Sequence, residues 1–128
     1  MTQELSLLVW SVLLTMAQVV VIIVGAVIQV DLRTLAGNRE TRVVLSGWAG
    51  RAQRAHVNML ENLPLFATLV LAAQVSNRLD GVTRLGAQTF FWARLAYVII
   101  YIAGISWLRS LVFAISVVGM LLILSQLL

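Results

Sequence analysis

The feature that most constrains this chain is an apolar run from Leu5 to Val30, which is about 26 residues long. One helical crossing of a bilayer needs about 20 consecutive apolar residues, so this run is long enough to span. It is too long for the core of a signal peptide, and the stretch before it carries Glu4 and no cation, so we do not expect cleavage. The run predicts a membrane helix over about 5–31.

The composition of the whole chain agrees with a membrane protein. The 128 residues are 61% hydrophobic and 11% charged, whereas soluble domains carry about 25% charged residues. So few charges cannot solvate the surface of a globule, which excludes a soluble enzyme. The net charge is +4 and every cation is arginine. We attribute this basicity to a membrane flank and expect no nucleic-acid partner.

A second apolar run, 63–75, is too short to cross a membrane by itself, because it has only about 13 residues. A spanning helix that ends near residue 76 must begin about 20 residues earlier. We therefore predict a helix over about 48–76. This prediction places Asn58 and Glu61 inside the membrane.

Two further apolar segments predict helices over about 83–107 and 109–128, after a turn rich in helix breakers at 77–81. Backbone groups in lipid must bond internally, and these runs lack the alternation of barrel strands. The length allows one compact unit. The predicted fold is all-α: a single domain over 1–128 that forms an integral membrane four-helix bundle.

The distribution of arginine predicts the orientation of this bundle. Arginines favour the cytoplasmic side of a membrane. The N-terminus has none, and the second connection has Arg78 and Arg84. The first and third connections hold Arg33, Arg39, Arg42, Arg51 and Arg109. We therefore expect the first and third connections in the cytoplasm and both termini outside.

Polar residues form one stripe on the second predicted helix. At about 100° per residue, Arg51, Arg54, Asn58 and Glu61 fall within an arc of about 80°. The stripe covers about 15 Å along the helix axis, from the cytoplasmic interface toward the middle of the membrane. Ionisable groups at that depth are costly and normally face a protein interior or a water-filled cavity. The stripe is therefore the candidate site.

The third predicted helix offers a matching face. Three of its residues lie at i, i+3 and i+7, namely Arg94, Tyr97 and Tyr101. Arginines bind carboxylates through paired hydrogen bonds, and a buried glutamate accepts from an ammonium group. The combined groups suit a small zwitterion with an excess of carboxylate. Alternatively, Glu61 only pairs with Arg54 or Arg94 to hold the bundle together.

The chain has no cysteine and a single histidine. These counts exclude disulfides, a protein thiolate nucleophile and cysteine-based zinc sites, and one histidine cannot form a histidine cluster. We therefore expect no metal cofactor.

The segment around the stripe resembles a signature of the membrane-associated proteins in eicosanoid and glutathione metabolism. It reads Arg-Ala-His-Val-Asn-Met-Leu-Glu-Asn-Leu-Pro over 54–64. The stretch Ala-Arg-Leu-Ala-Tyr over 93–97, followed by Tyr101 and Arg109, resembles the third-helix signature of the same family. The resemblance covers essentially the whole chain. It implies a homotrimer that holds glutathione between neighbouring subunits, in the cytoplasmic half of the membrane.

The resemblance also implies roles for single residues. Arg54 matches an arginine that binds a glutathione carboxylate, and Asn58 matches an asparagine that contacts the peptide backbone. Glu61 matches the glutamate that receives the γ-glutamyl amino group. Arg109 resembles the arginine that stabilises the thiolate, which makes it the expected catalytic residue, because a nearby cation lowers the pKa of a thiol. The other expected binding residues are Arg51, Arg94, Tyr97 and Tyr101.

Three positions have two explanations each. His56 stands where relatives carry Gln or His in contact with glutathione, and it points away from the stripe, toward a neighbouring subunit's ligand. It is equally well explained as a packed interface residue. Arg33 precedes Arg54 by the same distance as a ligand-contacting arginine in relatives, but a charge flanking the membrane explains it as well. Arg94 lies deeper than the rest and could mainly balance Glu61.

The expected function is a glutathione transferase or peroxidase that uses glutathione as co-substrate and acts on lipophilic small molecules among membrane lipids. No targeting peptide is apparent, so we expect the bacterial inner membrane. One alternative is a non-catalytic lipid-binding or scaffold member of the same family. Another is a small four-helix multidrug exporter, which would need a carboxylate in the first helix. None lies there between Glu4 and Asp31.

Overall fold

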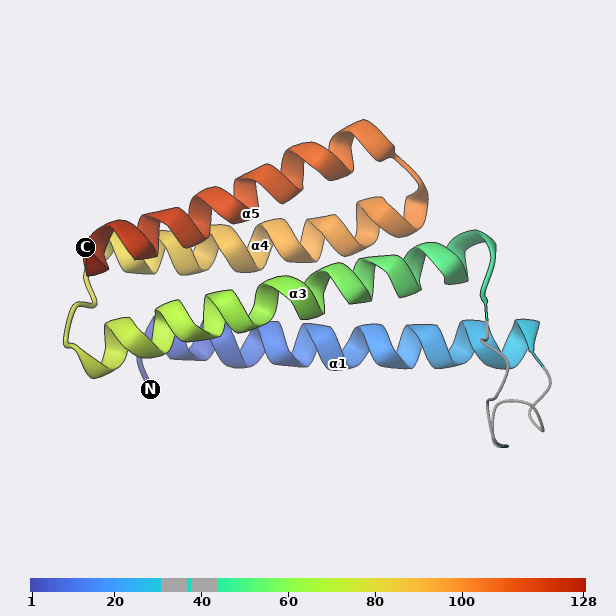
Figure 1. The fold of residues 1–128 in the computed structure, drawn as a ribbon, viewed down its shortest axis with the longest axis horizontal. Helices are drawn as coiled ribbons and strands as arrows, with labels where there is room; N and C mark the ends of the chain where they lie inside the picture. The colour runs from blue at the N-terminus through green and yellow to red at the C-terminus, as the bar shows by residue number, and fades with distance from the viewer. Residues whose placement is uncertain (31–36, 38–43) are drawn as a thin grey trace.

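A computed structural model describes residues 1–30, 37 and 44–128 of the chain. Within these residues the chain forms four helices, labelled as in Figure 1: α1 (Gln3–Gln29), α3 (Gly47–Val75), α4 (Gly81–Ala103) and α5 (Ser106–Leu127). Figure 1 shows the helices running side by side along one axis, with both chain ends at the same end of the bundle. The all-α four-helix fold predicted from the sequence is thereby confirmed.

On α1 polar side chains are buried and large apolar side chains are exposed, which is the reverse of a helix in a soluble protein. Its buried face carries Ser11, Thr15 and Gln18, while large apolar residues such as Val20 and Ile28 are exposed. The hydroxyl groups of Ser11 and Thr15 donate to the carbonyls of Leu7 and Ser11, one turn earlier, at 2.8 Å each. An apolar exterior over a polar interior face is stable only when lipid surrounds the helix.

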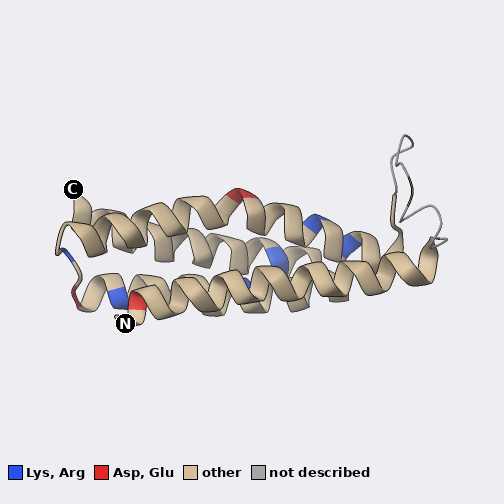
Figure 2. Ribbon diagram, turned by 90° about the horizontal axis from the view of Figure 1, so that it is seen from below, with Lys and Arg blue, Asp and Glu red and all other residues tan. Residues whose placement is uncertain are grey.

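Three of the four described helices, α1, α4 and α5, are long and apolar enough to cross a membrane. Figure 2 shows how few charged residues the ribbon carries along these helices. The remaining helix, α3, has 29 residues and therefore the length to span, but its arginines and glutamate lower its apolar character. That α3 crosses the membrane with the others stays a prediction.

The boundary between α4 and α5 differs from the sequence prediction. We expected the third helix to continue to residue 107, whereas α4 ends at Ala103 and α5 begins at Ser106. Gly104 adopts a left-handed conformation with φ of 86°. Its N–H donates to Tyr101 O at 3.0 Å, and the N–H of the next residue donates to Ile100 O at 3.3 Å. This is the Schellman arrangement that ends helices at glycine, and the apolar pattern alone does not reveal it.

The shift of this boundary moves Arg109. Arg109 was predicted at the third connection, as the first residue of a helix over 109–128, and it lies in the first turn of α5, which begins at Ser106. Its N–H donates to the carbonyl of Ile105, the residue that caps the helix, at 3.1 Å. The side chain of Arg109 therefore projects from the end of the first helical turn rather than from the start of the helix.

Close contacts join α3, α4 and α5 near the middle of the bundle and toward the end that is far from Gly104. Gly86 of α4 and Gly119 of α5 touch so closely that a Cβ built on Gly119 would lie 2.6 Å from Gly86 O. The rings of Phe66 and Phe90 stack between α3 and α4 with centroids 4.0 Å apart. Small residues that let backbones approach are typical of helix contacts in membranes. This packing fixes α3, α4 and α5 relative to one another, and the candidate site lies among these three helices.

Candidate functional site

Two adjacent cavities lie at the end of the bundle where α4 turns into α5. The larger has a volume of about 280 Å³ and is lined by Asn58, Tyr97, Tyr101, Arg109, Ser110 and Phe113. The smaller has a volume of about 80 Å³ and is lined by Arg51, Arg54, Tyr101, Gly104, Ile105, Ser106 and Arg109. Tyr101 and Arg109 belong to both cavities. The structure therefore brings six of the residues predicted for the site to one place.

Tyrosine rings and guanidinium groups alternate through the site. Two arginines contact the Tyr101 ring, with Arg109 Cζ 4.6 Å and Arg54 Cζ 6.0 Å from its centroid. The Tyr97 ring meets Tyr101 nearly edge-on, with centroids 5.5 Å apart and planes at 71°. Cations over aromatic faces are attracted by the ring quadrupole. These contacts hold the guanidinium groups beside the cavities without using their hydrogen-bond donors.

The electrostatics of the smaller cavity favour an anion. Three arginines line it, Arg51, Arg54 and Arg109, and neither set of lining residues includes an acidic side chain in the described part of the chain. Guanidinium groups present paired donors that match a carboxylate. The arrangement can therefore bind a small carboxylate ligand.

Arg51 also has a structural contact. Its Nε donates to the carbonyl of Ile102 at 2.8 Å, near the C-terminus of α4. Carbonyls there lack partners within the helix, and the negative end of the helix dipole favours a cation. Arg51 therefore ties α3 to the α4–α5 turn, and only its remaining nitrogens are free for a ligand.

Asn58 is positioned by a neighbour that the sequence analysis did not include. Asn62 is buried, and its Nδ2 donates to Asn58 O at 2.8 Å and to Asn58 Oδ1 at 3.3 Å. The bond to Oδ1 directs the amide group of Asn58, which lines the larger cavity. The i, i+4 spacing of these two asparagines on one helix was the available signal.

Arg94 lies behind the site rather than in it. It is fully buried, and none of its three side-chain nitrogens has a hydrogen-bond partner within the described residues. Its guanidinium lies 4.3 Å from the Tyr97 ring centroid and 6.0 Å from that of Phe113. Arg94 lines neither cavity. Within this chain its role is therefore to pack against Tyr97 and Phe113, two residues that do line the larger cavity.

Three other predicted site residues are not brought to the cavities. Glu61 is exposed on the surface of α3 and lines neither of them. His56 is half-buried and also outside both linings, and its buried Nε2 has no hydrogen-bond partner among the residues that the structure describes. Arg33 lies outside the described residues.

Two residues of α5 complete the site and were not among the predicted site residues. Ser110 follows Arg109 directly, and Phe113 lies one turn further along the same helix. The Phe113 ring also faces Tyr97, with centroids 6.3 Å apart. Once α5 is known to begin at Ser106, the i, i+4 spacing of Arg109 and Phe113 places both on one face.

The apolar exterior of the helices and the cationic cavity among them define an integral membrane protein of the helical-bundle class. A comparison with protein-family models identifies it further: the MAPEG family matches residues 7–128, and the chain belongs to this family of glutathione-related membrane proteins. The resemblance found in the sequence is thereby confirmed, and the multidrug exporter is set aside. A search of curated proteins found no match.

Proposed function

We propose that this chain is a glutathione-dependent membrane transferase or peroxidase that acts on lipophilic small molecules. The observation that carries the proposal is the arginine-lined cavity that opens beside Asn58 and the two tyrosines. Glutathione is a peptide with two carboxylates, one ammonium group and a thiol. Its carboxylates suit Arg51 and Arg54, and its amide groups suit Asn58.

The position of Glu61 supports assembly with further copies of the chain. Glu61 is exposed on a helix that packs among spanning helices, and an uncovered carboxylate in lipid is costly. We propose a homotrimer in which the exposed face of α3 meets its neighbours and glutathione lies between subunits. Glu61 and His56 would then reach a ligand that a single chain does not enclose.

In the proposed reaction, Arg109 stabilises the thiolate of bound glutathione. A cation near the sulfur favours loss of the thiol proton. The thiolate then forms a bond to an electrophilic carbon while the leaving group departs with its electron pair. A chain without cysteine can carry out this chemistry because the nucleophile belongs to the substrate. Both an electrophile and a hydroperoxide that dissolve in lipid could reach the site.

Thermal unfolding with and without millimolar glutathione tests the binding step. We expect glutathione to raise the Tm of the detergent-purified protein, because a ligand that binds only the native state stabilises it. A matched control is Arg78→Gln, since Arg78 lies at the other end of the bundle and donates to Leu127 O. The control should keep the full shift. No shift at saturating glutathione would refute the proposed function.

Arg109→Ala tests the catalytic step, with conjugation to a chlorinated nitrobenzene as the assay. We expect turnover to fall by about 100-fold, the typical loss when one group that stabilises developing charge is removed. Glutathione affinity should fall much less, because Arg51 and Arg54 remain. Equal losses of turnover and affinity would contradict the role of Arg109. A glutathione-dependent shift without turnover in the unmodified protein would favour the non-catalytic alternative.

We also propose an orientation and a location. Arg51, Arg54 and Arg109 all lie at the end of the bundle that carries the site, and the positive-inside rule places that end on the cytoplasmic side. Both termini would then lie outside, in a bacterial inner membrane.

A further inference from the structure

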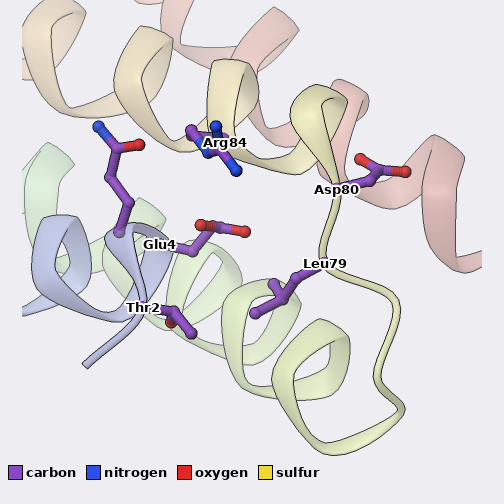
Figure 3. A pocket seen from close by; sticks show the side chains of 6 residues that line it. Thr2, Glu4, Leu79, Asp80 and Arg84 are labelled. Carbon is purple, nitrogen blue, oxygen red and sulfur yellow. The ribbon is translucent and has the colours of Figure 1, made fainter.

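A third polar cavity lies at the opposite end of the bundle, between the first turns of α1 and α4. Its volume is about 290 Å³ and its lining residues are Thr2, Gln3, Glu4, Leu79, Asp80 and Arg84 (Figure 3). It shares no residue with the two cavities of the proposed glutathione site. Nothing in the proposed transferase chemistry uses it.

Glu4 is the buried charged group of this cavity. Its residue is only 4% exposed, and its Oε2 accepts a hydrogen bond from the Thr83 hydroxyl at 3.0 Å. The same hydroxyl also lies 2.9 Å from Asp80 O, so Glu4 shares the one hydrogen of that hydroxyl with a second acceptor. The hydroxyl oxygen accepts from Asp80 N at 2.8 Å, which holds Thr83 in the cap of α4. Burying a carboxylate is costly unless further partners offset the loss of water. Because the Glu4 carboxylate has one neutral hydroxyl as its donor, it can still accept hydrogen bonds from a cationic group of a ligand.

The second carboxylate of the cavity is already occupied. Asp80 Oδ1 accepts from the N–H groups of Val82 and Thr83 at 2.9 Å each, as the cap of α4. Figure 3 shows the Asp80 carboxylate turned away, while Glu4 and Arg84 face the space between α1 and α4. The cavity therefore offers a ligand one carboxylate, on Glu4, and one guanidinium, on Arg84.

The depth of the cavity indicates where such a ligand would come from. The 27 residues of α1 make a helix about 40 Å long at 1.5 Å per residue. The hydrocarbon core of a bilayer is about 30 Å thick, and about 40–45 Å with the headgroups. Residues in the first turn of α1 and of α4 therefore lie at the level of the lipid headgroups.

We propose that this cavity binds the phosphoethanolamine headgroup of a membrane phospholipid. The Glu4 carboxylate accepts from the primary ammonium, and the Arg84 guanidinium donates to the phosphate. A primary ammonium has three N–H donors for a recessed carboxylate, whereas the trimethylated ammonium of a choline headgroup has none and is bulkier. The site therefore selects ethanolamine over choline, and it holds the acyl chains against the apolar outside of α1 and α4.

Native mass spectrometry of the detergent-purified full chain tests the proposal with three probes: dioleoyl phosphatidylethanolamine, dioleoyl phosphatidylcholine and soluble phosphoethanolamine. We expect the protein to retain the ethanolamine lipid with about tenfold or greater preference over the choline lipid. A preference of this size corresponds to the contribution of one hydrogen bond between charged groups. Glu4→Gln keeps an oxygen that accepts from Thr83 but removes the charge, so this preference should fall to less than about twofold. Arg84→Gln should weaken both lipids, because both carry the phosphate.

Arg78→Gln is the matched control for both variants. It removes a guanidinium at the same end of the bundle. That guanidinium donates to Leu127 O and does not line the cavity. The control should retain the ethanolamine preference. Equal binding of the two lipids by the unmodified chain would overturn the proposal, as would an undiminished preference in Glu4→Gln. Binding of soluble phosphoethanolamine without binding of the lipid would overturn the assignment to a membrane lipid.

Discussion

Arg94 has the most unusual environment of any single side chain at the site. It is fully buried in α4, and its nitrogens have no hydrogen-bond partner among the described residues. One prediction from the sequence was that Arg94 balances Glu61; in the described chain Glu61 is exposed and Arg94 is buried. Within one chain the guanidinium is instead stabilised by the faces of Tyr97 and Phe113. Burying a charge without hydrogen-bond partners is costly, and the only groups seen to offset that cost among the described residues are these two rings.

We predict that Arg94→Met raises the stability of the protein but weakens its binding of glutathione. Methionine retains much of the packing and removes a buried charge that has no hydrogen-bond partner in the described part of the chain. The free energy of unfolding should therefore rise by about 1–3 kcal/mol. The glutathione-dependent increase in Tm should shrink, because Tyr97 loses the group stacked on it. Thermal unfolding with and without glutathione measures both effects.

Arg94→Lys provides the comparison for this prediction. Lysine keeps the charge without the planar group that stacks on the ring, so it should not produce the gain in stability. A lower Tm for Arg94→Met would instead show that a neighbouring copy or a ligand supplies a partner for the charge.

At the scale of the elements, the seam between α4 and α5 determines the geometry of the site. The two helices touch at Gly86 and Gly119 and reverse direction at Gly104. This arrangement sets Arg109, on the first turn of α5, over the Tyr101 ring at the end of α4. The position of the catalytic candidate therefore depends on glycines that carry no chemistry of their own.

Gly119→Ala should weaken this seam. The added Cβ would lie 2.6 Å from Gly86 O and 2.8 Å from Phe90 N, so the helices must separate. Overpacking of this kind costs about 1–3 kcal/mol of stability. Turnover should fall along with Tm, because separation moves Arg109 away from Tyr101.

Gly81→Ala is the matched control on the same helix pair. A Cβ at Gly81 would meet nothing within 4 Å, and its φ is not in the left-handed region. Alanine there should leave Tm unchanged or raise it slightly. If both substitutions lowered Tm equally, the close approach of α4 and α5 would not be the cause.

At the scale of the whole molecule, the exposed face of α3 carries charged and polar side chains that no other helix of the same chain covers in the described structure. Polar residues stand exposed on this helix beside apolar ones, among them Arg54, Val57, Glu61, Pro64 and Thr68. Their spacing of three and four residues puts them on one face. If α3 crosses the membrane as predicted, lipid would not solvate Arg54 and Glu61. The proposed trimer would bury this face around its symmetry axis.

The absence of cysteine from the sequence allows a direct test by single-cysteine cross-linking. We predict that Thr68→Cys forms disulfide-linked dimers on oxidation in membranes, because only residues near a symmetry axis meet their own copies. Val20→Cys, on the exposed side of α1, should stay monomeric. Non-reducing gel electrophoresis distinguishes the two, and equal cross-linking of both variants would contradict a central α3.

The sequence determined the class of the fold and which residues share a helix face at the candidate site, because apolar length and helical spacing are properties of single segments. A run of the length of Leu5–Val30 in so weakly charged a chain can only be a membrane helix. The spacing of Arg51, Arg54 and Asn58 placed them on one face, and the structure brings all three to the cavities. The same spacing put Glu61 in the stripe, yet Glu61 faces outward.

Only the tertiary structure decided how those faces meet. The left-handed Gly104 ends α4 early enough for α5 to begin at Ser106, which puts Arg109 at the end of its first turn. Packing of α5 against α4 brought Phe113 to the site. The cap of α4 and the first turn of α1 together made a cavity from Glu4 and Arg84, which lie 80 residues apart in the sequence. Periodicity specifies which residues share a face of one helix, but contacts between helices depend on where each helix ends and how closely the backbones approach.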